Sequence, residues 1–502
     1  MKYCGAQVSP PPNVPIGKDS GTVLSLRVVE RFQAALRSGD RKGIVENGRQ
    51  LISQRAPLAG QWLQLAMILA VNGEVTLARQ ACRQLGEAFR GDLLATFGQV
   101  DVLAAVGAWD EVMTLLRAWP EHRPKPAAYA YTRGTAALYL GDMDEARHWL
   151  EEAVREHPRD GTPWLSLNLV LNFASEPELA EYVLACERTM QSSPPAIRGS
   201  YYYTVGKVHA DRGEPGRAFA AFSLGAQLLK LAVTYNREQD RASATEAVEG
   251  YDVARIAEIA RRQSEPTDRG IFVMGLPRSG TTLVEQILTS HSAVTDGAEI
   301  YRLPLLAKDV GGAGYAAVRR YVDEAGPVSA ARLWRHWLDE RFPAPGRVVA
   351  KTLINSRFLG VAASLLPEAP LISLTRDPLD CAWSCFRTRF AGEAAWSYDL
   401  EDIAFHFRLE DELMARWQDI LVDRLLVVPY EKLATEPEPW IKRILAHCRL
   451  PEEPGPFAPH ENARAVTTTS AMQVRRPINR AGIGSAEPYR EFLAPFVEAY
   501  FR

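Results

Sequence analysis

The sequence predicts two folds in one chain, N-terminal helical repeats followed by an α/β domain with a parallel sheet. Three observations predict this fold class. A period of 34 residues runs through the first half of the chain. A strand, a glycine loop and a helix start follow one another from Gly270 to Leu288. Beyond that segment, short apolar runs alternate with helical patterns, which is typical of a parallel sheet covered on both faces.

The chain is long enough for several domains, because it has 502 residues and single hydrophobic cores rarely grow past about 250–300. We place a loose tail at residues 1–23, a stretch rich in Pro, Gly and Ser. Residues 24–262 are the predicted helical repeat domain. Residues 263–269 are a linker, and residues 270–502 are the α/β domain.

The 34-residue period is marked by small turn residues, with a slightly longer interval before the last one: Gly39, Gly73, Gly107, Gly141, Ser175 and Gly213. Five residues after each marker stands a small or aliphatic side chain: Ile44, Ala78, Val112, Ala146, Ala180 and Ala218. This pattern resembles the tetratricopeptide repeat, in which two antiparallel helices cross closely and glycine ends the first. Repeat stacks create concave surfaces. The sequence leaves open whether this one binds a peptide or protein acceptor, forms a homodimer or buttresses the second domain.

The bulk properties are those of an ordinary globular protein. The net charge of −3 argues against a general nucleic-acid binder. The six cysteines form no CxxC pair, which suggests neither a disulfide framework nor a zinc site and favours a reducing compartment. We find no apolar run of the roughly 18 residues that a membrane span needs and no signal peptide at the N-terminus. We therefore expect a cytoplasmic protein without a membrane partner.

The segment Gly270–Leu288 predicts an anion site. Its apolar strand leads into the tight loop Gly275–Gly280, and a helix starts at Thr281. Backbone N–H groups of such a loop point at one spot, where the helix dipole also favours negative charge. The nucleotide-binding P-loop has this shape but places lysine after its second glycine. Here Thr281 takes that position and Arg278 is the fixed charge, so we expect a P-loop-like site of another kind.

Polar side chains also stand at the ends of three later predicted strands. Lys351 ends one apolar run, Arg376 follows the next, and Tyr430 follows the third after a proline. In parallel α/β sheets, ligands bind beyond the carboxyl ends of the strands. We therefore expect these residues and the glycine loop to line one site.

From about Gly270 onward the sequence resembles sulfotransferases that use 3′-phosphoadenosine 5′-phosphosulfate (PAPS), and its catalytic part is similar to the protein-tyrosine sulfotransferases. With its repeats, the whole chain resembles the bacterial tetratricopeptide-repeat sulfotransferases. The resemblance implies that the loop binds the 5′-phosphosulfate through Pro277, Arg278, Ser279, Gly280, Thr281 and Thr282. It implies that Arg376 and Ser384 hold the 3′-phosphate and that Tyr430 lies near the nucleotide. No metal is expected, since cations and dipoles would bind the donor.

The same resemblance implies catalytic roles. Arg278 and Lys351 would stabilise charge on the sulfuryl and phosphate oxygens. Small-molecule sulfotransferases carry a basic His two residues after the equivalent of Lys351, but this chain has Leu353 there. Glu299 matches the base of the protein-tyrosine branch, so we expect it to be the general base, with His291 as a weaker alternative.

Two further features concern the C-terminal part of this site. Ser470 matches a serine that assists at the leaving phosphate in the protein-tyrosine branch. The family then carries a basic segment that closes over the nucleotide, whereas this chain has Gly482–Glu487 without the usual basic residue. Arg480 and Arg490 are the candidates to replace it.

We therefore predict a PAPS-dependent sulfotransferase that moves a sulfuryl group to an acceptor hydroxyl, either a peptide tyrosine or another phenol; a saccharide stays open. A nucleotide kinase is one alternative, against which the missing loop lysine argues. A non-catalytic repeat scaffold with a relic nucleotide-binding domain is another, against which the complete set of site residues argues. Binding of the product nucleotide, 3′-phosphoadenosine 5′-phosphate (PAP), would separate an enzyme from a relic.

Overall fold

The computed structural model describes residues 20–120, 126–352, 354–390, 394–462, 464 and 474–502. The chain divides into two compact units. The first contains Met1–Pro124 and His336–Pro343, and the second contains Lys125–Arg335 and Ala344–Arg502.

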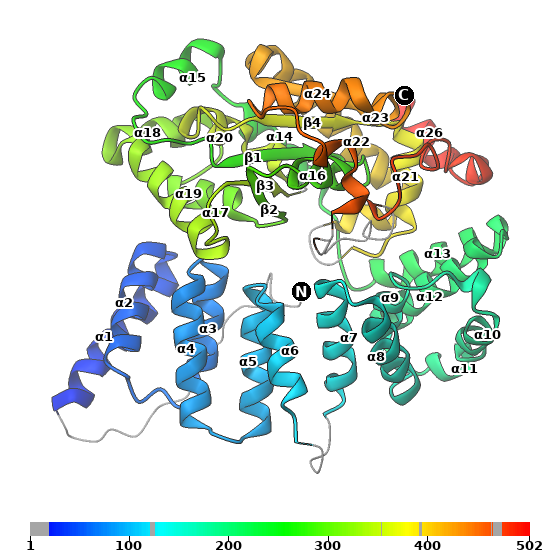
Figure 1. Cartoon of the computed structure of the whole chain (residues 1–502), viewed down its shortest axis with the longest axis horizontal. Helices are drawn as coiled ribbons and strands as arrows, with labels where there is room; N and C mark the ends of the chain where they lie inside the picture. The colour runs from blue at the N-terminus through cyan, green and yellow to red at the C-terminus, as the bar shows by residue number, and fades with distance from the viewer. Residues whose placement is uncertain (1–19, 121–125, 353, 391–393, 463, 465–473) are drawn as a thin grey trace. The chain divides into compact units, whose positions relative to one another are not determined.

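The first unit is helical throughout its described part (Figure 1). Its helices are α1 (Ser20–Ser38), α2 (Arg41–Ser53), α3 (Gln61–Val71), α4 (Val75–Ala88), α5 (Leu93–Ala105) and α6 (Trp109–Arg117), together with the end of α19 (Pro327–Arg341). Successive helices pair as α1 with α2, α3 with α4 and α5 with α6. This unit is thus a row of helix pairs.

Five of the six 34-residue markers are turns between two paired helices, whereas Ser175 ends the short 3-10 helix Phe173–Ser175. Gly39, Gly73, Gly107 and Gly141 have φ between 69° and 89°, the left-handed region that only glycine enters without strain. Each lies at or just beyond the end of the first helix of its pair. The small residues five positions later are buried, with exposed fractions of 4% at Ile44 and 0% at the other five. The predicted helix pairs are therefore confirmed.

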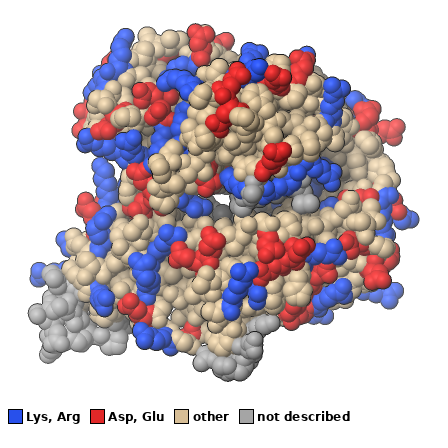
Figure 2. Space-filling model, in the orientation of Figure 1, with Lys and Arg blue, Asp and Glu red and all other residues tan. Residues whose placement is uncertain are grey.

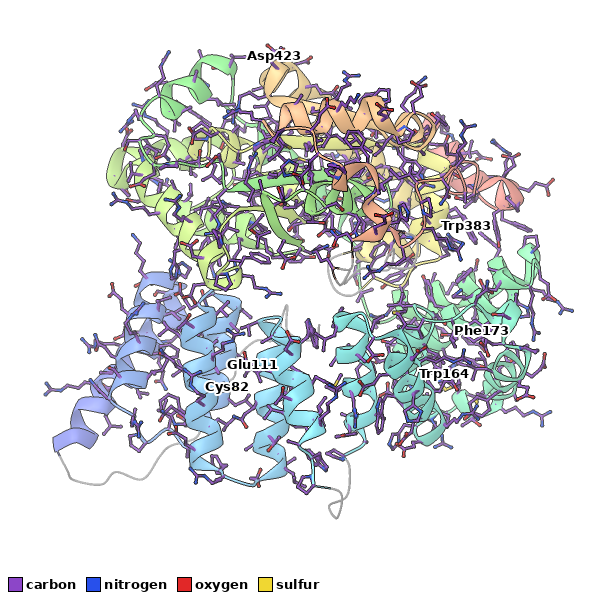
Figure 3. The ribbon with its side chains drawn as sticks, in the orientation of Figure 1. Cys82, Glu111, Trp164, Phe173, Trp383 and Asp423 are labelled. Atoms are coloured by element: carbon purple, nitrogen blue, oxygen red, sulfur yellow. The ribbon has the colours of Figure 1, made fainter. Side chains whose placement is uncertain are left out.

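The second unit begins with more helices: α7 (Ala128–Leu140), α8 (Met143–Glu156), α9 (Gly161–Leu167), η1 (Phe173–Ser175), α10 (Pro177–Ala185), α11 (Glu187–Met190), α12 (Pro195–Asp211), α13 (Pro215–Lys230), α14 (Arg237–Val248) and α15 (Val253–Ala260). Their aromatic side chains form a core in which Trp164, Phe173 and Tyr201 are completely buried (Figure 3). These rings pack the helices together and do not face a groove.

A five-stranded parallel sheet follows, in the order β2-β3-β1-β4-β5. Its strands are β1 (Gly270–Gly275), β2 (Val294–Ala298), β3 (Arg347–Lys351), β4 (Leu371–Thr375) and β5 (Leu425–Pro429). The helical elements around it are α16 (Thr281–Thr289), α17 (Arg302–Val310), α18 (Tyr315–Ala325), η2 (Asn355–Phe358), α20 (Leu359–Leu365), α21 (Pro378–Phe386), η3 (Ala395–Tyr398), α22 (Leu400–Leu421), η4 (Val422–Arg424), α23 (Tyr430–Thr435), α24 (Pro437–His447), η5 (Gly455–Phe457), η6 (Pro459–Glu461), η7 (Glu487–Tyr489) and α26 (Ala494–Phe501).

Helices cover both faces of this sheet (Figure 1). On one face, Ile271 and Val273 of β1 pack in a cluster with α16 and α24. On the other face, Phe272 contacts Trp334 of α19, with ring centroids 5.1 Å apart. Neighbouring side chains of a strand point to opposite faces. The fully apolar run of β1 therefore packs against helices on both faces of the sheet.

An aromatic cluster joins the helical part of the second unit to the sheet domain. Trp383 of α21 contacts Phe222 of α13 edge to face, with ring centroids 5.7 Å apart. It also stacks on Tyr489, with ring centroids 3.7 Å apart. Both Trp383 and Phe222 are buried, and Figure 3 labels Trp383 within this region. Helices α12 to α13 are therefore part of the same core as α21.

Charges of both signs are spread over the face that Figure 2 shows, and a group of Lys and Arg lies near its centre. Within the described residues, no helix combines the length and the apolar character that a bilayer-spanning segment needs.

The predicted fold class is confirmed as paired helices followed by an α/β domain with a parallel sheet. Strand β2 was not predicted. Its sequence contains Thr295, Asp296 and Gly297, and it lies at the edge of the sheet. An edge strand needs no continuous apolar run, because it is not buried on both faces as a central strand is.

Candidate active site

The glycine loop connects β1 to α16. Gly275 ends β1 with a φ of 147°, and an added Cβ there would lie 2.7 Å from the Leu374 carbonyl oxygen. Gly280 precedes α16 with a φ of 105°. Between them, Arg278 is a non-glycine residue with a φ of 71°, a conformation that costs roughly 1–2 kcal/mol. Such conformations persist only where the surroundings hold them, and they cluster at functional sites.

The parallel register brings the other predicted residues to the same edge of the sheet. Lys351 ends β3 beside β1, and Arg376 and Tyr430 directly follow the paired ends of β4 and β5. Glu299 directly follows the β2 residue that is paired with Ala350. Four strand ends therefore present polar side chains next to the loop.

These residues form two polar clusters. The first, which we call the transfer cluster, consists of Thr282, Glu285, Glu299, Lys351 and Arg464. The Lys351 ammonium lies 3.3 Å from Thr282 Oγ1, 3.2 Å from Glu299 Oε1 and 3.4 Å from Glu285 Oε2. Burial disfavours the charged amine, but the two carboxylates outweigh burial and raise the pKa of Lys351. Lys351 is therefore a cation at neutral pH.

Glu285 and Arg464 were missed by the reasoning from sequence. Arg464 Nη2 lies 3.1 Å from Glu285 Oε1, and its Nε donates to Asp296 Oδ1 at 2.7 Å. Burial lowers the pKa of Arg464, but Glu285 and Asp296 outweigh this and raise it. A glutamate on an amphipathic helix looks like a solvated residue, and Arg464 is distant in sequence, so neither carries a local signal.

The second cluster, which we call the phosphate cluster, consists of Arg278, Arg376, Ser384, Arg387 and Tyr430. Arg278 Nε donates to Ser384 Oγ at 3.0 Å, and Arg376 Nη1 donates to the Arg278 carbonyl at 2.8 Å. The Arg376 guanidinium lies 4.5 Å from the Tyr430 ring centroid, which is a cation–π contact. Loop, strand end and helix α21 therefore meet at Arg278 and Arg376.

The arginines of the phosphate cluster repel one another. Burial, and then the charges of Arg387 and Arg376, lower the pKa of Arg278 to about 10. Burial is also the main cause that lowers the pKa of Arg387, and Arg376 adds to it. With a pKa of about 10, Arg278 remains charged at neutral pH. Among the described atoms, Ser279 Oγ and Arg376 Nε are buried without a hydrogen-bond partner, so donors remain for a ligand rich in acceptor oxygens.

The C-terminal segment is anchored beside this cluster by Asp380. The Asp380 carboxylate accepts N–H bonds from Gly484 and Ala486, both at 2.8 Å. Arg376 also donates to the carbonyl of Gly482. Arg490, one of the two proposed closing residues, forms an exposed ion pair with Glu487 at 2.9 Å, and Arg480 stays a prediction.

The remaining predicted residues are placed as follows. Pro277 and Thr281 are buried in the loop and at the start of α16. His291 accepts the Ala293 N–H at Nδ1 and donates to the Pro451 carbonyl at Nε2. Backbone groups thus engage both ring nitrogens, which disfavours His291 as a base. Ser470 and Leu353 lie outside the described residues, and no three His, Cys, Asp or Glu side chains within the described part are grouped to hold a metal ion.

Two tyrosines lie near Glu299. Tyr301 follows it by two residues, with a left-handed φ of 44° and 37% of its surface exposed. Tyr139 lies near the end of α7. Burial raises the pKa of Tyr139, and the charges of Tyr131 and Glu299 add to the effect. An aromatic residue of the helical region therefore shares the electrostatic environment of Glu299.

A second contact places the end of α7 near the transfer cluster. An added Cβ at Gly141, two residues after Tyr139, would lie 3.8 Å from Arg475 Nη2. Arg475 in turn donates to the Arg464 carbonyl at 2.7 Å. The side chain of Arg475 thus connects the turn after α7 with the backbone of Arg464 in the transfer cluster.

Comparison with known proteins agrees with this geometry. Residues 270–454 match the family model described as the sulfotransferase family. The C-terminal half of the chain therefore carries a domain of this enzyme family. The helical half is outside the match.

Individual relatives cover different parts of the chain. An uncharacterized protein of Aquifex aeolicus (strain VF5) is 26% identical over 401 residues, which are 77% of this chain and 52% of that protein. Protein-tyrosine sulfotransferase 1 of Danio rerio is 27% identical over 190 residues, which are 36% of this chain and 53% of that protein. The chain spans about half the length of these curated relatives.

Among solved structures, the sulfotransferase domain from the Synechococcus PCC 7002 olefin synthase is similar to part of the chain. It is 18% identical and covers 45% of this chain and 90% of that domain, with a TM-score of 0.34.

Proposed function

We propose that the chain transfers a sulfuryl group from PAPS to an acceptor hydroxyl. One observation carries this proposal. A cluster of arginines and a cluster of paired cations and carboxylates lie at the same edge of the sheet in a sulfotransferase-family domain. The phosphate cluster gathers three guanidiniums. The transfer cluster places a lysine beside the carboxylate of Glu299. The first suits a nucleotide with several phosphates, and the second suits proton transfer beside a cation.

The residues present fit the donor. When bound, PAPS supplies a sulfuryl group attached to a phosphate oxygen. The loop residues from Pro277 to Thr282 would hold the 5′-phosphosulfate, and Arg376 and Ser384 the 3′-phosphate, with Tyr430 beside them. Arginine is suited to this role, because its planar donors match phosphate oxygens in pairs. The buried, unpartnered Ser279 Oγ and Arg376 Nε supply further donors within the described site.

The chain's own residues would divide the reaction between them. Glu299 takes the proton of the acceptor hydroxyl as that oxygen forms its bond to sulfur. Arg278 and Lys351 donate to the oxygens on which charge builds as the bond from sulfur to the phosphate oxygen breaks, its electron pair staying on the phosphate. In this proposal, Ser470 assists at the same phosphate.

We propose an aromatic hydroxyl, either a peptide tyrosine or another phenol, as the acceptor. Tyr301 is exposed two residues from Glu299, and Tyr139 shares its electrostatic environment. Aromatic rings favour offset or edge-to-face contact with other rings, so these two side chains suit a flat acceptor. Similarity to the Danio rerio protein-tyrosine sulfotransferase favours the same class.

The helical half is proposed to be a tetratricopeptide-type repeat domain over residues 24–262, joined by a linker at 263–269 to the catalytic domain. The 34-residue spacing and the helix pairs support this proposal. In this proposal the repeats dock a peptide or protein acceptor in the cytoplasm, and a homodimer is the alternative use of the same surface.

Calorimetry with PAP tests the donor half of the proposal. We expect PAP to bind, and adenosine 5′-phosphate to bind at least about tenfold more weakly, because it lacks the phosphate that Arg376 and Ser384 would hold. A relic domain would bind neither. A nucleotide kinase would bind ATP and hydrolyse or transfer its γ-phosphate, so ATP turnover is measured in parallel.

A screen with labelled PAPS tests the acceptor half. Tyrosine peptides, simple phenols and saccharides are compared as acceptors. We expect label on aromatic hydroxyls. Label on saccharides alone would overturn the aromatic assignment while leaving the sulfotransferase assignment intact.

A further inference from the structure

Glu285 is a buried carboxylate in the transfer cluster to which the proposed reaction assigns no role. We propose that Glu285 is a positioning residue that holds the Lys351 ammonium in place and charged, so that Glu299 can leave Lys351 and act as the base. This inference rests on the proposed function.

The geometry around Lys351 requires an exchange of partners. An ammonium has three donors, and three oxygens already lie within 3.4 Å of Lys351 Nζ, on Thr282, Glu285 and Glu299. Lys351 can donate to a sulfuryl or phosphate oxygen only if one of these partners gives way.

Burial decides which carboxylate leaves. The side chain of Glu299 is 35% exposed, whereas that of Glu285 is 3% exposed. Water can replace Lys351 at Glu299. Glu285 has no such replacement, and a buried charge that loses a partner is costly. The exchange therefore frees Glu299, which is the residue that needs to be free to take a proton.

Arg464 keeps Glu285 in place during this exchange. It lies 3.1 Å from Glu285 Oε1, on the carboxylate oxygen that does not face Lys351, and it is itself held by Asp296 at 2.7 Å. The Glu285 carboxylate thus lies between the Lys351 ammonium and the Arg464 guanidinium. A merely structural ion pair would stabilise the fold without affecting the position or charge of Lys351. Structural and positioning roles can therefore be separated experimentally.

The experiment compares the full chain with Glu285→Gln, which keeps shape and removes charge, and Glu285→Asp, which keeps charge and shortens the side chain. Glu74→Gln is the matched control, because Glu74 is also 3% exposed and paired with two basic side chains, Arg41 at 3.1 Å and His336 at 2.9 Å. Three quantities are measured: kcat against pH, PAP affinity, and the pKa of the Lys351 amine by pH-dependent acetylation and mass spectrometry.

We expect Glu285→Gln to lower kcat by about tenfold or more and to leave PAP affinity within about twofold. The pKa of Lys351 should fall by about one unit or more, since a neighbouring carboxylate no longer offsets burial. The alkaline limb of the kcat profile should move to lower pH with it. Glu285→Asp should restore the alkaline limb to its wild-type pH. Glu74→Gln should change neither the Lys351 pKa nor the pH of this limb.

A wild-type limb and a wild-type Lys351 pKa in Glu285→Gln would overturn the inference. So would a loss of kcat that Glu74→Gln reproduces. If Glu285→Gln fails to fold, Glu299→Gln decides: we expect a smaller fall in the Lys351 pKa there, and a fall of more than about one unit contradicts the role of Glu285. The acetylation readout needs no turnover, so failure of this inference is distinguishable from absence of PAP binding and sulfuryl transfer, which would sink the proposed function.

Discussion

The two clusters of the candidate site differ in the charges that they bring together. In the transfer cluster, cations and carboxylates alternate from Asp296 through Arg464, Glu285 and Lys351 to Glu299. In the phosphate cluster, burial and then the neighbouring guanidiniums lower the pKa of Arg278, and burial together with the charge of Arg376 lowers that of Arg387. The first is compensated before any ligand arrives, whereas the second gathers guanidiniums, of which Arg376 lies 3.9 Å from the Asp380 carboxylate.

This difference separates stability from binding. Removing a cation from the compensated cluster deprives the buried Glu285 carboxylate of a partner, so it should destabilise the fold. Removing a cation from the crowded cluster relieves repulsion, so its cost should appear in nucleotide affinity. Four substitutions test this contrast.

Lys351→Met should have the largest effect. It removes the ammonium from Glu285 and Glu299, and breaking a buried pair costs roughly 3–5 kcal/mol. We expect turnover to fall by about 10³-fold, comparable to the loss of an oxyanion donor, together with a clear drop in melting temperature. Chemical denaturation and labelled-PAPS kinetics measure both. A variant that loses turnover at unchanged stability would contradict the compensated description of the cluster.

Glu299→Gln should reduce turnover by about a hundredfold, the usual contribution of a general base. Because its side chain is 35% exposed, stability should change by less than about 1 kcal/mol. PAP affinity, measured by calorimetry, should be unchanged. Full activity in this variant would remove Glu299 from the mechanism.

Arg376→Met should act on affinity. We expect PAP to bind about thirtyfold more weakly, which corresponds to about 2 kcal/mol for a lost charge-assisted contact. Adenosine 5′-phosphate, which lacks the 3′-phosphate, serves as the matched control ligand and should lose much less. The melting temperature without ligand should fall less than in Lys351→Met, because Arg376 loses two backbone contacts and lies 3.9 Å from Asp380 but leaves a group of like charges. An equal loss for both nucleotides would show that Arg376 does not read the 3′-phosphate.

Ser384→Ala should have the smallest effect. The hydroxyl accepts from Arg278 Nε at 3.0 Å, and a single hydrogen bond is worth about 1 kcal/mol. PAP affinity should fall about fivefold, with turnover at saturating donor unchanged. A loss in turnover instead of affinity would place Ser384 on the transfer side of the site.

Local patterns explain what could be predicted from the sequence. The glycine loop lies within one strand-loop-helix unit, so its spacing indicates its geometry, whereas Arg376 and Ser384 were paired by the family resemblance. The turn glycines were predictable for the same reason, because each closes one helix pair.

Long-range contacts explain what could not be predicted. Glu285 and Arg464 are 179 residues apart and meet only in the folded chain. The direction of Arg376, whose donors reach the carbonyls of Arg278 and Gly482, also depends on the tertiary fold. Strand β2 could not be predicted because Thr295, Asp296 and Gly297 interrupt any apolar run in it.

Helix α21 has a consequence beyond the site. It carries Ser384 in the phosphate cluster, and its neighbouring Trp383 is packed against Phe222 of α13. One helix thus contributes to the phosphate cluster on one side and packs against α13 on the other. If a ligand shifts α13 and thereby changes the affinity for the nucleotide, the nucleotide must change the affinity for that ligand by the same factor, because thermodynamic coupling is reciprocal. Measuring acceptor binding with and without PAP would therefore report on the repeats without touching the chemistry.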